Sequence, residues 1–187
     1  MDRNSNSYTF LFAIIMVVVI ASLLAYTATS LKPLQTKNVK NETMQNILAS
    51  IGEEVDRDAA QGKFDEYVKK QISLKADGTV DPSVDAFGIN MQNEIKKPVD
   101  EQRFPLYIAE KDGQTYYIVP LQGYGLWDAI WGYVALEADA NTIKGAKFDH
   151  AGETPGLGAE IKESWFGAQY NGKQVLDENG AFVSVKA

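Results

Sequence analysis

The sequence predicts an α+β domain with a largely antiparallel sheet flanked by helices, preceded by a single transmembrane helix. Three observations support this. An uncharged apolar run lies near the amino terminus, a region of helical period follows it, and short strand-like runs joined by turn signals fill the second half. Strands grouped in one part of a chain, with helices before and after them, are typical of the α+β class.

The first predicted element is the transmembrane helix. Residues 8–26 read YTFLFAIIMVVVIASLLAY without a charge, and about 19 residues at ~1.5 Å each approach the ~30 Å hydrocarbon thickness. A cleavable signal peptide is the alternative, but it would have a shorter apolar region and a more basic leader. We therefore predict a cytoplasmic leader at residues 1–7 and a transmembrane helix at residues 8–27.

Charges flanking the helix bear on its orientation. The positive-inside rule, applied to Arg3 on one side and Lys32, Lys37 and Lys40 on the other, would place the following domain in the cytoplasm. This count is weak evidence for the orientation.

Residues 28–75 are predicted to form a linker and juxtamembrane helices. Residues 27–38 are largely polar and contain Pro33, which favours a linker. Apolar residues then recur at three- and four-residue spacing on two helices separated near Gly62, and their common role is core packing. They are Val39, Met44, Ile47, Leu48, Ile51 and Val55, then Phe64, Tyr67, Val68 and Ile72.

Residues 76–187 are predicted to form the α+β domain. Aromatic and β-branched runs flank Asp112-Gly113, and a second pair of short apolar runs flanks Asn179-Gly180, both typical hairpin patterns. A short helix is expected at residues 159–167. The predicted strand pairs are residues 104–110 with 114–120, 131–137 with 142–148, and 174–176 with 182–185.

Composition excludes several classes of function. The chain has no cysteine and one histidine, His150, so thiolate chemistry, disulfides and multi-histidine metal sites are excluded. No Gly-x-Ser-x-Gly elbow, Walker loop or Gly-x-Gly-x-x-Gly fingerprint is present. The net charge of −7 argues against nucleic acid as a partner. We expect no catalytic residue and no metal site, so any redox role would belong to an organic cofactor.

Two glycine-rich segments are the candidate ligand site. Residues 150–160 read HAGETPGLGAE and residues 123–128 read GYGLWD. Each has a purely structural alternative, a tight strand-to-helix connection for the first and an aromatic core element beside a bulge for the second. If the hairpin between them brings both to one end of the sheet, backbone donors and apolar side chains would together suit a flat heteroaromatic ring.

The order of these motifs resembles a known family. Residues 123–128 (GYGLWD), 131–139 (WGYVALEAD), 141–145 (NTIKG) and 152–158 (GETPGLG) closely resemble the C subunit of the bacterial sodium-translocating NADH:quinone oxidoreductase, as does the single amino-terminal anchor. The G subunit of the related Rnf electron-transport complex shares the ETPGLG run and is the alternative family. The GLW and ALEAD elements favour the former.

The resemblance implies a flavoprotein that relays electrons through FMN inside a six-subunit, sodium-translocating ubiquinone reductase. It implies a single pass through the bacterial inner membrane with the flavin domain in the periplasm, which overrides the lysine count. In that family, a threonine in a Ser/Thr-Gly-Ala-Thr motif holds FMN covalently. No such motif occurs here, so we expect the threonine beyond Ala187 and a sequence truncated before it. A family member that has lost the linkage is the alternative.

The resemblance also implies two walls of a flavin pocket. Leu157 is expected to contact the ring, and Glu153 is expected to disfavour negative charge on it. His150 is as well explained by a surface position as by a place near the ring. A membrane-anchored sensor or scaffold module without redox function remains the alternative of a different class. The predicted walls are Gly125, Leu126 and Trp127 on one side, and Glu153, Thr154, Gly156, Leu157 and Gly158 on the other.

Overall fold

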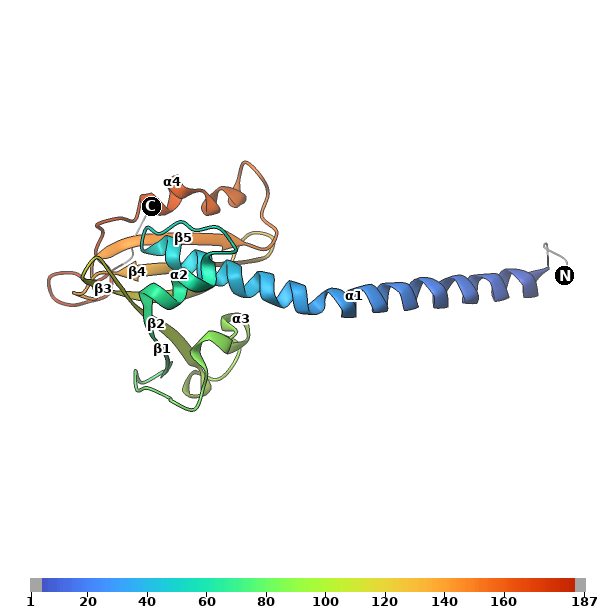
Figure 1. Ribbon diagram of the computed structural model, residues 1–187, viewed down its shortest axis with the longest axis horizontal. Helices are drawn as coiled ribbons and strands as arrows, with labels where there is room; N and C mark the ends of the chain where they lie inside the picture. Colours follow the sequence, from blue (N-terminus) through green and yellow to red (C-terminus); the bar gives the residue numbers. More distant parts are fainter. Residues whose placement is uncertain (1–4, 184–187) are drawn as a thin grey trace. The chain divides into compact units, whose positions relative to one another are not determined.

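The computed structural model describes residues 5–183, and the chain divides into two compact units at Lys40 and Asn41. Helix α1 (Asn6–Ser50) supplies the described part of the first unit and the first residues of the second (Figure 1). By length and composition, α1 is the one helix among the described residues able to cross a membrane. The predicted apolar amino-terminal helix is therefore present.

The linker predicted for residues 27–38 is helical instead. Pro33 lies inside α1, although proline removes a backbone donor and crowds the carbonyl four residues earlier. Such helices continue with a local bend when neighbouring turns remain bonded. The Thr36 hydroxyl donates to the Lys32 carbonyl at 3.0 Å, and the Thr27 hydroxyl donates to the Leu23 carbonyl at 2.9 Å. These side-chain bonds supplement the backbone hydrogen bonds of α1 on both sides of Pro33.

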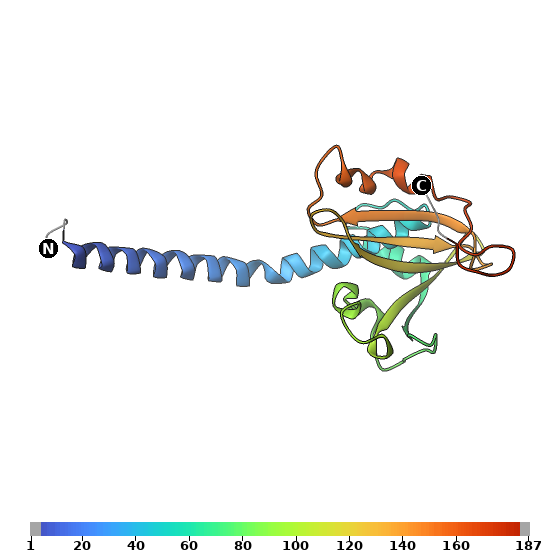
Figure 2. The ribbon, with the colours of Figure 1, turned by 180° about the vertical axis from the view of Figure 1, so that it is seen from behind.

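The second unit is built on a five-stranded sheet in the order β1-β2-β3-β4-β5, with every neighbouring pair antiparallel (Figures 1 and 2). This confirms the predicted α+β class. The strands are β1 (Val68–Lys75), β2 (Arg103–Lys111), β3 (Gln114–Tyr124), β4 (Ala129–Leu136) and β5 (Ile143–His150). The helices are α2 (Ala60–Tyr67), α3 (Met91–Glu94) and α4 (Ser164–Ala168), with single 3-10 turns η1 (Ala86–Gly88), η2 (Val99–Glu101) and η3 (Gly158–Lys162).

The hairpin joining β2 and β3 follows from its turn residues. Asp112 has φ 53° and Gly113 has φ 76°, the left-handed pair that a two-residue hairpin turn requires. Lys111 and Gln114 then pair across it. The Asn179-Gly180 turn leads only to an isolated bridge between Leu176 and Phe182, and residues 184–185 of that predicted strand lie outside the described residues.

The second predicted helix is shorter than expected. Helix α2 ends at Tyr67, and Val68 and Ile72 belong to β1. The spacing of four between these two residues fits a helix face and also fits one face of a strand, because four is a multiple of two. Pairing with β2 favours the strand, because the backbone N–H and C=O groups of β1 then bond to those of β2.

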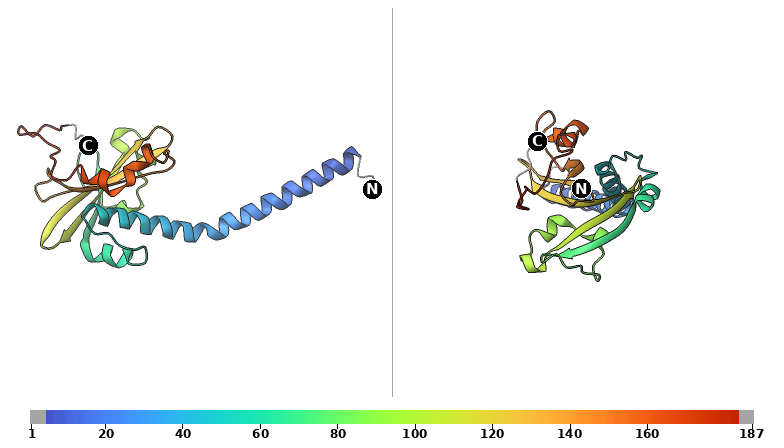
Figure 3. Two further views of the ribbon diagram at one scale, coloured as in Figure 1. Left: turned by 90° about the horizontal axis from the view of Figure 1, so that it is seen from above. Right: turned by 90° about the vertical axis from the view of Figure 1, so that its left-hand side faces the viewer.

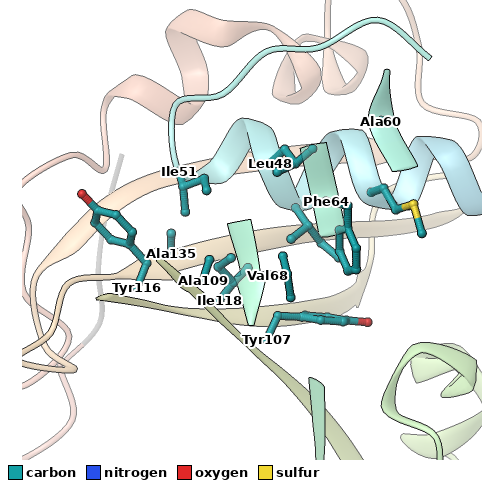
Figure 4. Packing of buried hydrophobic residues seen from close by; sticks show 12 residues of the cluster. Leu48, Ile51, Ala60, Phe64, Val68, Tyr107, Ala109, Tyr116, Ile118 and Ala135 are labelled. Atoms are coloured by element: carbon teal, nitrogen blue, oxygen red, sulfur yellow. The ribbon is translucent and has the colours of Figure 1, made fainter. Parts of the chain in front are cut away.

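One face of the sheet carries the main core. The last turns of α1 and helix α2 pack there, and Figure 4 shows Phe64 of α2 near Tyr107. Phe64 lies edge-on to Phe87 and Tyr107 at centroid distances of 5.7 and 6.2 Å. Edge-to-face rings at this separation stabilise each other beyond their buried area. The cluster contains Met44, Ile47, Leu48, Ile51, Ala60, Phe64, Val68, Tyr107, Ala109, Tyr116, Ile118 and Ala135.

The segment after β5 packs back onto that strand. Phe148 of β5 lies 5.6 Å from Phe166 of α4 and 5.4 Å from Tyr170, measured between ring centroids. A Cβ at Gly167 would collide with the Ala146 carbonyl oxygen, so α4 approaches β5 as only glycine permits. Figure 3 shows this orange and red segment beside the sheet. The loop before η3 is therefore anchored at both ends.

Candidate functional site

Two loops meet at one end of the sheet. The first, residues 125–128, joins β3 to β4, and the second, residues 151–157, leaves β5. Tyr124 pairs with Ala129, and Ile130 pairs with His150. Because antiparallel neighbours reverse direction, the end of β3, the start of β4 and the end of β5 lie together. The structure thus brings together the two segments that the sequence singled out.

The loops enclose a pocket of about 430 Å³. Seven of the eight predicted residues line it, and the eighth, Gly156, does not. Gly156 instead takes a left-handed turn with φ 76°, and its N–H donates to Glu160 Oε1 at 3.0 Å. The full lining is Gly125, Leu126, Trp127, Ile130, Glu153, Thr154, Leu157, Gly158 and Ile161.

Sequence reasoning missed Ile130 and Ile161. Ile130 is the second residue of β4, and the glycines and tryptophan of the preceding segment are the more conspicuous sequence signal. Ile161 lies on η3, four residues after Leu157, a spacing that could have placed both on one side of a helical turn. Both isoleucines add apolar surface to the pocket.

Glu153 fastens one loop to the other. Its side chain is buried, with 7 % of the residue exposed, and its Oε1 accepts the N–H of Trp127 at 2.9 Å and that of Asp128 at 3.2 Å. The Gly125 N–H donates to the Asp128 carbonyl at 2.8 Å and closes the receiving loop. Bonds from backbone N–H groups to a carboxylate are charge-assisted and stronger than neutral ones. Glu153 therefore joins the two walls.

These bonds also set the ionisation of Glu153. The Trp127 N–H lowers the pKa of the carboxyl most, burial opposes it, and the N–H groups of Asp128 and Leu126 lower it further. Hydrogen bonds to the charged form favour that form. The base of the pocket therefore carries a negative charge at neutral pH.

The glycines on either side make room for this carboxylate. A Cβ on Gly125 would lie 2.7 Å from Glu153 Cδ and 3.0 Å from Ile130 Cγ2, while a Cβ on Gly158 would lie 2.6 Å from Glu153 Oε2. Real Cβ atoms do not approach so closely, and neither glycine has a left-handed φ. Their small size, and not their conformational freedom, is what the site uses.

His150 holds the backbone of Glu153. Its Nδ1 accepts the Glu153 N–H at 3.2 Å, while the backbone N–H of His150 donates to Asp149 Oδ1 at 2.8 Å. The Nε2 atom is buried and has no hydrogen-bond partner among residues 5–183. The histidine is therefore part of the loop architecture and not a residue of the pocket lining.

The pocket is apolar at its rim. Leu126, Trp127 and Leu157 are 83 %, 70 % and 73 % exposed, which is unusual for large apolar side chains gathered around one opening. Among the described residues that line the pocket, Glu153 is the single charged one, and none is a lysine or arginine. The arrangement fits a flat, mainly apolar ring system with polar edges and offers no cation from these residues to a phosphate.

Two larger cavities lie elsewhere. One of about 530 Å³ is lined by apolar residues of β3, β4 and β5 together with Tyr170, Val175 and Phe182, and its described lining has no charged group that would orient a ligand. Another, of about 510 Å³, is lined by charges of both signs, including Glu42, Arg57 and Lys147. Size alone would favour these two, but neither is lined by a predicted residue. Residues 5–183 contain no group of three or more potential metal-ligating side chains.

The chain is similar in sequence to known proteins. The sequence model of the FMN-binding domain family matches residues 125–185. The C subunit of the Na(+)-translocating NADH-quinone reductase from Pseudomonas aeruginosa is 29 % identical over 201 residues, which cover 96 % of this chain and 76 % of the relative.

Two crystal structures are similar to the fold. The C subunit of the Na(+)-translocating NADH-quinone reductase from Parabacteroides distasonis is 38 % identical with a TM-score of 0.76, covering 83 % of this chain and 77 % of that one. Shewanella oneidensis NqrC is 26 % identical with a TM-score of 0.64, covering 79 % and 78 %.

Proposed function

This chain belongs to the family of the C subunit of the Na(+)-translocating NADH-quinone reductase, and from that premise we propose that it relays electrons through FMN whose ring lies in the pocket between residues 125–128 and 151–158. As a family member it is an FMN-binding subunit of an oxidoreductase complex. The observation that carries the proposal is the joining of both walls through Glu153.

The residues of the pocket fit a flavin ring in shape and polarity. Apolar side chains such as Trp127, Leu157 and Ile161 would cover the ring faces and exclude water, and Thr154 would supply a hydroxyl or a backbone group to its polar edge. FMN, when bound, supplies the one- and two-electron chemistry. The chain itself binds, orients and sets the local charge, with Glu153 disfavouring additional negative charge beside it.

The phosphate requires a different anchor, because no cation among the described residues lines the pocket and Glu153 would repel it. We propose that a threonine beyond Ala187 holds the phosphate covalently, as the family resemblance implies. The described residues would then provide the ring site, while attachment fixes the other end of the cofactor. Covalent tethering of this kind would offset weak noncovalent affinity by raising the effective concentration of the ring.

We also propose the setting of the subunit. Helix α1 would cross the bacterial inner membrane once, with the flavin domain in the periplasm and the other five subunits of the complex as partners. The length and apolar composition of α1 support the crossing. The orientation and the number of partners rest on family membership.

A single substitution tests the site. Leu157→Glu in the detergent-solubilised full chain places a carboxylate at the rim, where it should weaken FMN binding about tenfold or more, because a carboxylate against an apolar ring loses hydration. The measurement is quenching of flavin fluorescence in an FMN titration. Val99→Glu, at a position that is 69 % exposed on η2, is the matched control and should leave binding unchanged.

Two results would separate the flavin carrier from the anchored scaffold. Unchanged affinity in Leu157→Glu would remove this loop from the flavin site. If the protein extended through the attachment threonine stays colourless after production with its flavin transferase, the electron-carrier proposal fails and the anchored scaffold becomes the better explanation.

A further inference from the structure

We propose that His150 is a positioning residue of this pocket: its imidazole Nδ1 accepts the Glu153 N–H and thereby positions the carboxylate that joins the two walls. Its importance for a flavin rests on the proposed function. Its role in fixing the loop rests on the hydrogen bonds alone, and the two can be tested separately.

The position of His150 is set by the sheet. It ends β5 opposite Ile130, a pocket residue, and directly after it the Ala151 N–H donates to the Ala129 carbonyl at 2.9 Å. Directly opposed residues of an antiparallel pair lie on the same face of a sheet. The imidazole therefore projects from the end of β5 on the same face as Ile130, which suits it to hold the loop that follows.

The loop itself is internally compact but needs a tie to the opposite wall. The N–H groups of Leu157 and Ala159 both donate to the Thr154 carbonyl, and these bonds do not reach residues 125–128. The connection runs instead from His150 Nδ1 to the Glu153 N–H, and from Glu153 Oε1 to the N–H groups of Trp127 and Asp128. His150 thus holds the backbone of Glu153, and the Glu153 carboxylate holds the opposite loop.

This arrangement determines which tautomer is present. Because Nδ1 accepts a hydrogen bond, it carries no proton, and the neutral ring must carry its proton on Nε2. That Nε2 is buried without a partner among the described residues. Burying an unpaired N–H opposes folding, and the bond from the Glu153 N–H to Nδ1 is the hydrogen bond that the ring makes among those residues.

Two amide side chains distinguish the acceptor role from simple filling of space. The oxygen of asparagine can lie where Nδ1 lies, at the same number of bonds from the backbone, whereas the glutamine oxygen lies one bond farther out. His150→Asn should therefore keep the bond to the Glu153 N–H. His150→Ala and His150→Gln should lose it.

Amide hydrogen exchange of the full chain without flavin is the direct readout. His150→Ala and His150→Gln should speed exchange at Glu153, Trp127 and Asp128 about three- to tenfold, the ratio expected for one lost hydrogen bond. His150→Asn should stay within about twofold of the natural protein. If His150→Ala does not fold, the comparison of the asparagine and glutamine variants decides.

Titration with FMN then links the tie to the ligand. We expect the affinity to fall about three- to tenfold in the alanine and glutamine variants and to be retained in the asparagine variant. Equal exchange in all four proteins, or an asparagine variant as fast as alanine, would overturn the positioning role. If exchange follows the expected pattern while the affinity for FMN is the same in all four proteins, the pocket is not the flavin site and the positioning role stands.

Discussion

Replacing Gly125 by alanine should separate the two walls of the pocket. The new methyl group would lie 2.7 Å from Glu153 Cδ and 3.0 Å from Ile130 Cγ2. Ile130 is held in β4, and Glu153 cannot move away without leaving the N–H groups of Trp127 and Asp128. Overpacking of this kind costs about 1–3 kcal/mol.

Thermal unfolding of the full chain measures that cost. A destabilisation of about 2 kcal/mol corresponds to a Tm lower by about 4–8 °C in a protein of this size. Gly152→Ala in the neighbouring loop is the control, since its Cβ would meet Asp128 Cβ at 3.6 Å, an ordinary contact. The effects of Gly125→Ala and Glu153→Ala should be less than additive, because removing the carboxylate relieves the clash. Equal Tm values for Gly125→Ala and Gly152→Ala would refute the steric explanation.

Two further predictions concern the rest of the domain. Phe64→Ala should lower the free energy of unfolding by about 3–5 kcal/mol in urea titrations, because it empties the centre of the core, whereas Val99→Ala on the surface should change it little. Hydrogen bonds from Ser83 and Arg103 lower the pKa of Asp81 from 3.8 to about 2, so its stabilising contribution is present above about pH 4 and is lost as the pH falls towards 2. Asp81→Asn should flatten the acid dependence of Tm in that range, and Asp100→Asn should leave it unchanged.

Local chemistry made much of the fold predictable. The turn at Asp112-Gly113 demands two left-handed residues, and few sequences other than Asn-Gly or Asp-Gly meet that demand. The errors came where a local signal was compatible with two structures. Pro33 suggested a linker, although the surrounding residues continue the helix. In β1, a spacing compatible with two structures was resolved only by pairing with β2.

The location of the site was predictable for a similar reason, but its construction was not. Composition marked the loops, and antiparallel connectivity brought them to one end of the sheet. The tie between Glu153 and Trp127 joins residues 26 positions apart, so it depends on the relative placement of two loops. No local pattern specifies which acceptor a backbone N–H will find at that separation.

The two glycines of the ETPGLG run have different physical roles. Glycine-rich loops are usually explained by left-handed backbone or by close approach to a ligand, and Gly156 does take a left-handed turn. Gly158 and the distant Gly125 instead leave space for the Glu153 side chain. The carboxylate needs that space to reach the Trp127 and Asp128 N–H groups, and those bonds keep it ionised. The motif therefore organises the pocket through one buried carboxylate, and ligand contact follows from the shape that this carboxylate imposes on both loops.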